Sequence, residues 1–259
     1  MHHRTIEQLA ASDGPVHRLD PRIKLVCALG FIVVVAVLPG RPLNFVLPAV
    51  IVISGLLAAR LPWGFVLSRT LMVLPFVAMV AIFLPFTRGV DVVWSLGTTG
   101  ITIYREGLEL CLIILSKGVL AILAVEWLVF TTRFNRLLVA MRSLKVPRVI
   151  VVTLAFLFRY LDLLADQSLR MRRARSSRTP GQPVRWRWRS AGGMIGQLLV
   201  RAMDRADRVH RAMVARGFDG EVRILANFKI RKVDFVFLIG FILLLSTVIV
   251  VGQLVEGFK

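Results

Sequence analysis

Apolar residues in this chain gather in long, nearly uninterrupted runs separated by short polar breaks. A helix needs roughly 17–25 such residues to cross a bilayer, and each run is at or near that length. The pattern therefore predicts an all-α polytopic membrane protein with about five transmembrane helices. The five runs cover residues 23–38, 43–59, 65–86, 107–130 and 233–251.

Proline and capping residues predict where several of these helices begin and end. Asp20 followed by Pro21 is a good helix start, because a carboxylate can cap the first-turn N–H groups and proline lacks one. Residues 39–42 (Pro-Gly-Arg-Pro) predict a tight turn after the first run. Pro75 predicts a kink in the third run, and residues 87–105 predict a polar loop.

Residues 131–232 have a different, amphipathic pattern. A short helix is predicted before Pro147, a long helix after it, a break at residues 177–190, and a last helix that ends at Gly217 as its C-cap. Apolar positions three or four residues apart predict one stripe on each long helix. The two stripes are Leu154, Phe158, Leu161, Ala165 and Leu169, and Ile195, Leu198, Leu199, Ala202, Ala206, Val209 and Met213.

Charge separates the same segment from the rest of the chain. Residues 131–232 hold 23 Lys and Arg against 6 Asp and Glu, or +17 of the net +19. We therefore divide the chain into 1–130 with four spans, 131–232 as a cytoplasmic domain of long helices, and 233–259 with the last span. The positive-inside rule places the protein in the cell membrane with its N-terminus and basic segment in the cytoplasm and its C-terminus outside.

Few residues offer catalytic or metal-binding chemistry. Four scattered histidines and two cysteines inside apolar runs lack the spacing of a metal site, and no P-loop, GxSxG or HExxH motif is present. We predict no catalytic residue, no metal site and no bound cofactor in this chain.

Two charged residues lie within the fourth apolar run. We interpret Lys117 as a structural contact between helices, and Glu126 as near enough to the membrane edge for its side chain to snorkel to the surface.

Tryptophan and arginine alternate at residues 185–190, in the sequence RWRWRS. Such a segment can contact anionic lipid or nucleic acid. Next to apolar spans it favours anchoring at the bilayer surface, so we expect a lipid partner and no nucleic acid.

Each of the two long basic helices ends in an arginine between small residues. These tripeptides are Ala174-Arg175-Ser176 and Ala215-Arg216-Gly217. A cation suits the C-terminal end of a helix dipole, and small neighbours leave room for the guanidinium to enter a crevice. Either tripeptide alone can be interpreted as an ordinary basic helix end. The presence of both in one segment is harder to explain in that way.

Nearly the whole chain resembles the transmembrane T component of energy-coupling factor (ECF) importers. The resemblance rests on these two tripeptides and on the segment PVHRLDPRIKL at residues 15–25. The segments PFTRG (residues 85–89) and FLFRYLDLL (156–164) are most similar to its cobalt and nickel branch, the CbiQ-like proteins. The resemblance implies a non-catalytic coupling subunit. Two ATP-binding cassette ATPases would bind ATP and Mg²⁺, and Arg175 and Arg216 with their small neighbours would dock on them.

The resemblance also implies a separate membrane S component, here metal-binding, that takes up cobalt or nickel. Three alternatives stay open. The first is a T component for a vitamin such as biotin or riboflavin, because the HRLDPRxKL motif is shared with those proteins. The second is an integral membrane enzyme acting on an anionic substrate, and the third is a membrane-tethered nucleic-acid binder.

Overall fold

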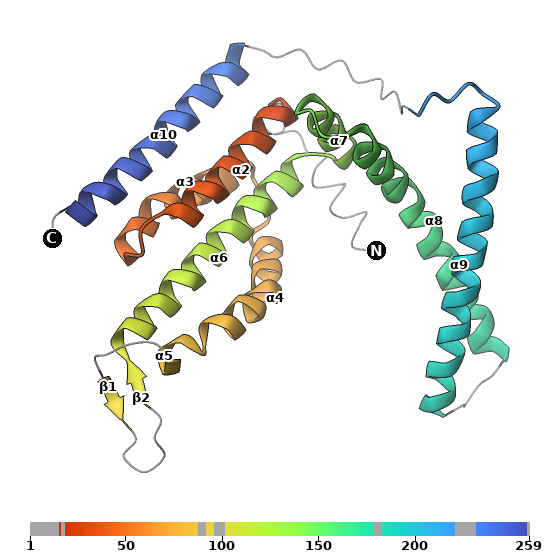
Figure 1. The fold of residues 1–259 in the computed structure, drawn as a ribbon, viewed down its shortest axis with the longest axis horizontal. Helices are drawn as coiled ribbons and strands as arrows, with labels where there is room; N and C mark the ends of the chain where they lie inside the picture. Colours follow the sequence, from red (N-terminus) through yellow and green to blue (C-terminus); the bar gives the residue numbers. More distant parts are fainter. Residues whose placement is uncertain are drawn as a thin grey trace. The chain divides into compact units, whose positions relative to one another are not determined.

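The computed structural model describes residues 16, 19–87, 92–95, 102–178, 183–220 and 232–257 (Figure 1). The chain divides into two compact units. The first, which we call the bundle unit, combines Met1–Ala140 with Ala226–Lys259, and the second, the hairpin unit, comprises Met141–Leu225. Expectations for residues 1–15, for His17 and for the polar loop around Arg88 lie outside the described residues.

The bundle unit contains the apolar helices. They are α2 (Pro21–Val37), η1 (Pro42–Phe45), α3 (Val46–Ala58), α4 (Trp63–Ala81), α5 (Leu84–Thr87), α6 (Arg105–Thr131) and α10 (Lys232–Gly257). The long helix α6 lies at the centre and packs against α2, α3 and α4, and α10 packs on α2. Phe31, Leu56 and Phe130 are among the side chains of the core.

Local sequence explains where α2 begins. Asp20 adopts an extended backbone and its side chain accepts a hydrogen bond from the Arg22 N–H at 2.9 Å, while Pro21 occupies the first helical position. The predicted start is therefore confirmed, and the turn predicted at residues 39–42 separates α2 from η1.

Among the described residues, three helices are long and apolar enough to cross a bilayer: Trp63–Ala81, Arg105–Thr131 and Lys232–Gln253. Together with the helical content they bear out an all-α membrane protein. The first two predicted spans correspond to helices that are shorter than these three, α2 with 17 residues and α3 with 13. Helix α3 and the helix of the third run are shorter than predicted, the latter because a turn at Ile82–Phe83 separates α4 from the one-turn α5.

A small antiparallel pair departs from the expectation of a loop between the third and fourth runs. Strand β1 (Val92–Ser95) pairs with β2 (Thr102–Tyr104), and the register is irregular between Val92 and Trp94. The β-branched and aromatic residues of both strands favour this pairing over a polar loop. The pair leads directly into α6.

The hairpin unit is built from α8 (Arg148–Arg178) and α9 (Val184–Val214), which run antiparallel side by side (Figure 1). The short helix α7 (Phe134–Ser143) precedes them at the boundary between the units. The break predicted at residues 177–190 is wrong in length. Helix α8 continues to Arg178 and α9 begins at Val184, so the Trp-Arg segment is the first part of a helix.

The predicted stripe of α8 is not the face that meets α9. The groove between the two helices is lined from α8 by Thr153, Phe156, Leu157, Tyr160 and Leu164. Leu161 and Leu169 of the predicted stripe are exposed. For α9 the prediction holds at Ala202, Ala206, Val209 and Met213, which line the groove, whereas Ile195 and Leu199 are exposed.

Candidate coupling site

The first small-Arg-small tripeptide lies in the last turn of α8. Ala174 and Ser176 are exposed and Arg175 is half-buried, and the Ser176 hydroxyl donates to the Arg173 carbonyl at 2.8 Å. Arg175 follows Met171 by four residues and Leu164 by eleven, which places it on the side of α8 that faces α9. Its stem is therefore supported by the hairpin itself.

The second tripeptide closes α9. Ala215 is the C-cap and its N–H donates to the Arg211 carbonyl at 3.0 Å. Gly217 has φ +79°, the predicted left-handed conformation, which glycine adopts without strain. The prediction that Gly217 is itself the C-cap is wrong by two residues, because the helix ends at Ala215. The turn is fixed by a hydrogen bond from the Phe218 N–H to the Met213 carbonyl at 3.0 Å.

Arg216 belongs to this terminating turn rather than to the last turn of the helix, where we had predicted it. Its backbone N–H donates to the Met213 carbonyl at 3.0 Å, and its side chain is exposed. The two arginines are thus presented differently. Arg175 projects from a regular helix and is partly covered, whereas Arg216 projects from a rigid turn with small residues on both sides.

The antiparallel hairpin holds the two tripeptides at opposite ends. Arg175 lies three residues before the end of α8, next to the start of α9, and Arg216 lies just beyond the far end of α9. Helix α9 has 31 residues, and a rise of 1.5 Å per residue separates the two arginines by about 40 Å. The hairpin therefore holds the two small-Arg-small tripeptides at opposite ends.

Inside the bundle unit, buried polar groups join three helix ends. The Lys24 ammonium donates to the Thr131 carbonyl at the end of α6, at 2.9 Å, and the Asp20 N–H donates to Asp234 Oδ1 on α10 at 3.1 Å. Lys24 is 1% exposed and interacts electrostatically with the cation of Arg136 and with both carboxylates. These residues tie α2, α6 and α10 together, a role that the sequence alone did not reveal.

The two intramembrane charges of α6 also have defined positions. The Lys117 ammonium donates to the Ala36 carbonyl of α2 at 2.8 Å, so the predicted contact between helices is confirmed. Glu126 does not snorkel. Its side chain is buried against α4, where it accepts a hydrogen bond from the Thr70 hydroxyl at 3.4 Å. The prediction failed because position along the helix does not reveal which side chains face a neighbouring helix.

No group of three or more metal-ligating side chains occurs within the described part of the chain. The cationic ends of a helical hairpin, attached to an apolar bundle, are the chemically distinctive features of this structure. The family model for CbiQ, described as a cobalt transport protein, matches residues 13–226. This chain belongs to the CbiQ family.

Individual relatives agree with this assignment. The cobalt transport protein CbiQ of Rhodobacter capsulatus is 27% identical over 79% of this chain and 80% of its own length. The energy-coupling factor transporter transmembrane protein EcfT of Limosilactobacillus fermentum is 29% identical over 80% of this chain and 81% of its own. An uncharacterised protein of Methanocaldococcus jannaschii, MJ1089, is 22% identical over 93% and 90%. This CbiQ-family chain is a T component of an ECF transporter.

Proposed function

We propose that this T component couples ATP hydrolysis on two cytoplasmic ATPase subunits to substrate uptake through a membrane S component. The observation that carries the proposal is the placement of Arg175 and Arg216 at opposite ends of one helical hairpin. Two contact points about 40 Å apart can reach two separate protein surfaces at once. Movement of those surfaces would then be transmitted through the hairpin.

Arginine suits such a contact because its planar guanidinium forms several directed hydrogen bonds with carboxylates or carbonyls in a groove. Ala174, Ser176, Ala215 and Gly217 limit steric hindrance around the two arginines. The strongly basic segment would also be attracted to acidic docking surfaces. In this proposal ATP and Mg²⁺ are bound by the ATPases, and this chain has no catalytic residue of its own.

The orientation follows from charge. With the N-terminus and hairpin unit in the cytoplasm, most of the positive charge lies on the inner side of a multi-pass membrane protein, as the positive-inside rule requires. Both docking arginines would then be accessible to soluble ATPases.

For the substrate we propose cobalt or nickel ions, because the family model and the Rhodobacter relative carry cobalt transport in their names. The EcfT relatives favour a second candidate, a vitamin importer. Uptake of labelled Co²⁺, Ni²⁺, biotin and riboflavin, measured in cells that express the chain with its genomic neighbours, separates the two. Stimulated uptake of a vitamin without uptake of metal would overturn the metal assignment.

The docking role is tested by replacing the arginines. Losing one partner of a desolvated charged contact costs about 2–5 kcal/mol, but a second contact keeps the complex tethered. Arg175→Ala and Arg216→Ala should each weaken ATPase binding and slow uptake, and the double variant should abolish both while it still inserts and retains the S component. Arg201→Ala and Arg208→Ala are matched controls on α9. A double variant that assembles and transports normally would refute the proposal.

A further inference from the structure

The chain passes between its two compact units at two places, and a buried polar cluster lies close to both. The bundle unit ends at Ala140 and resumes at Ala226. Shortly before the first crossing lies Thr131, the last residue of α6, and the buried residue Leu138 of α7 lies between them. Shortly after the second crossing lies Asp234, in the first turn of α10. The start of α2 contacts both of these helix ends.

Three side chains form this contact: Asp20, Lys24 and Asp234, which we call the clamp. The Lys24 ammonium donates to the Thr131 carbonyl at 2.9 Å, and the Asp20 N–H donates to Asp234 Oδ1 at 3.1 Å. Their residues are 5%, 1% and 3% exposed. The N-cap and first turn of α2 therefore hold both the helix that leads toward the hairpin unit and the helix that returns from it.

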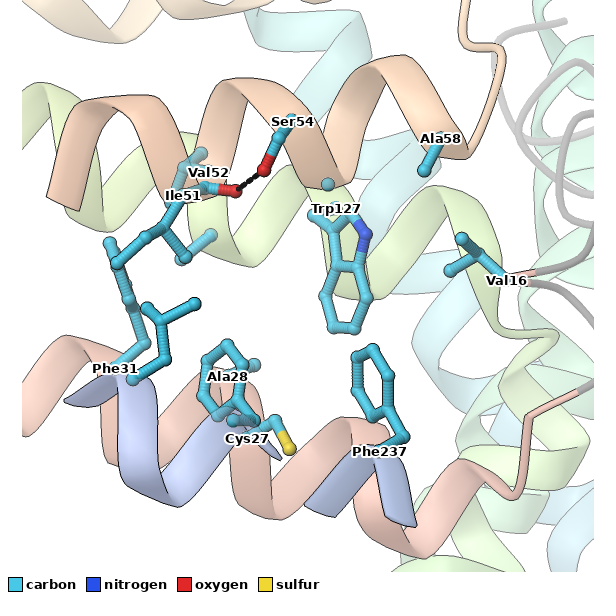
Figure 2. Close-up of a pocket in the computed structure, with 14 residues that line it drawn as sticks. Val16, Cys27, Ala28, Phe31, Ile51, Val52, Ser54, Ala58, Trp127 and Phe237 are labelled. Carbon is cyan, nitrogen blue, oxygen red and sulfur yellow. Dashed lines mark hydrogen bonds between the residues drawn. The ribbon is translucent and has the colours of Figure 1, made fainter. Parts of the chain in front are cut away.

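Apolar packing beside the clamp is incomplete. A cavity of about 360 Å³ lies among α2, α3, α6 and α10, and its lining includes Cys27, Trp127 and Phe237. Figure 2 shows these side chains around the space. Each lies about one helical turn further into the bundle than the residue of the same helix that takes part in the clamp contacts. Close-packed side chains fix helices in one arrangement, and here the hydrogen bonds of the clamp supply what the packing lacks.

Buried charges are a costly way to join helices. Their desolvation offsets much of their attraction, and apolar residues of similar volume often stabilise a fold at least as well. Apolar contacts have no direction, whereas a hydrogen bond to a charged group fixes which atoms meet. The chemistry of the clamp therefore suits a defined position of two helix ends better than it suits stability alone.

We propose that the clamp positions the bundle for energy coupling, by holding the ends of α6 and α10 against α2 so that movement of the hairpin unit reaches all three helices together. This inference rests on the proposed docking of ATPases on the two arginines of the hairpin. Without the clamp, the ATPases would still dock and hydrolyse ATP. The displacement would then be lost at the loosened helix ends, beside a cavity that leaves them room to move.

The test uses the complex of the chain with its ATPases and S component, co-expressed from its genomic neighbours and reconstituted in vesicles. Uptake is measured with the probe among labelled Co²⁺, Ni²⁺, biotin and riboflavin that the unaltered complex transports, and ATP hydrolysis is measured in the same vesicles. Lys24→Met and Asp234→Ala each remove one clamp contact. Both should retain ATPase binding and hydrolysis, while uptake per ATP hydrolysed falls at least about threefold.

Lys117→Met is the matched control, because Lys117 also joins α6 to α2 but from the middle of α6. It should leave uptake per ATP unchanged. A ratio that stays normal in both clamp variants, or that falls equally in Lys117→Met, would overturn the inference. Loss of hydrolysis in proportion to uptake would also overturn it, since that is the effect of a purely structural contact. Failure of the docking proposal is seen separately, in normal ATPase binding by the double arginine variant.

A second measurement needs neither ATPases nor substrate. With the native cysteines replaced by alanine, spin labels are attached to Leu29→Cys on α2 and Val236→Cys on α10, two exposed positions. Electron paramagnetic resonance on the full chain in vesicles should give one narrow distance distribution. Asp234→Ala should broaden it, and Lys117→Met should not. Equal widths in all three proteins would show that the clamp does not fix α10.

Discussion

Lys24 shows how a single charge can organise the bundle unit. Its ammonium donates to the last carbonyl of α6 and is influenced by the cation of Arg136 as well as by the carboxylates of Asp20 and Asp234 at the starts of α2 and α10. Lys24→Met keeps the length of the side chain but removes the charge and the hydrogen bond. A charged hydrogen bond in a buried site contributes about 1.5–3 kcal/mol, and we expect a loss of that order in thermal unfolding of the detergent-solubilised protein.

Lys117→Met is the matched control for this prediction. Lys117 also donates to a carbonyl of another helix, Ala36 of α2, but it is only half-buried and lies in the middle of an apolar helix. A hydrogen bond at a more exposed position costs less to lose than a buried one, so the net effect should be smaller than that of Lys24→Met. Equal destabilisation by the two substitutions would contradict the organising role of Lys24.

Gly217 provides a second prediction at the scale of one residue. An alanine at φ +79° costs about 1–2 kcal/mol, so Gly217→Ala should distort the turn that presents Arg216. We expect weaker binding of the ATPases, by up to about tenfold, in a pull-down assay. Gly193→Ala in the interior of α9, where a Cβ meets no atom within 4 Å, is the control and should bind normally. Unchanged binding by Gly217→Ala would mean that the turn geometry is unimportant.

Local chemistry explains which single residues were predictable. The N-cap at Asp20 and the left-handed Gly217 follow from neighbouring residues alone, and both were predicted. The partner of Lys24 is 107 positions away at Thr131, and Glu126 meets Thr70 on another helix. Contacts of that kind depend on how the helices pack, which a single sequence does not specify.

At the scale of elements, the hairpin of α8 and α9 can hold its two ends at a fixed distance only if it is stiff. Val200 is exposed near the middle of α9, and a proline there would remove a helical hydrogen bond and cost about 3 kcal/mol or more. Val200→Pro should leave both arginines present but disturb the spacing between them. We expect transport to fall to a small fraction of normal while ATPase binding resembles that of a single-arginine variant.

Val200→Ala is the control for this substitution, since alanine at an exposed helical position preserves the helix. Membrane insertion should be equal in both variants, which a fractionation experiment checks. Normal transport by Val200→Pro would show that the separation of the two docking ends need not be fixed.

The two long helices α8 and α9 show why the spacing of apolar residues predicted the presence of a helix better than it predicted which face of the helix packs against its neighbour. Apolar spacing located α8, but α8 carries apolar residues on more than one side, and Phe156, Tyr160 and Leu164 rather than the expected stripe line the groove with α9. The start of α9 was missed because prolines and glycine suggested a long break. The Trp-Arg alternation has no helical period in six residues, so it gave no signal of a helix.

At the scale of the whole molecule, the topology depends on whether the short helices α2 and α3 cross the bilayer. Helix α2 has 17 residues and α3 with η1 has the same number, which corresponds to about 25 Å each if fully helical. That is slightly less than the hydrocarbon thickness of about 30 Å. Local thinning of the bilayer accommodates such a mismatch at small cost.

We therefore expect the turn between α2 and η1 to reach the outer surface. With both native cysteines replaced by alanine, Arg41→Cys should react with a membrane-impermeant maleimide added to intact cells. Ser177→Cys, exposed near the end of α8, should react only after permeabilisation, since the positive-inside rule places the hairpin unit inside. If Arg41→Cys also requires permeabilisation, α2 and α3 form a re-entrant pair and the chain crosses the membrane three times. Both outcomes leave the C-terminus on the opposite side from the hairpin unit, because among the described elements only α10 lies between them. External labelling of Ser177→Cys is therefore the result that would refute the orientation itself.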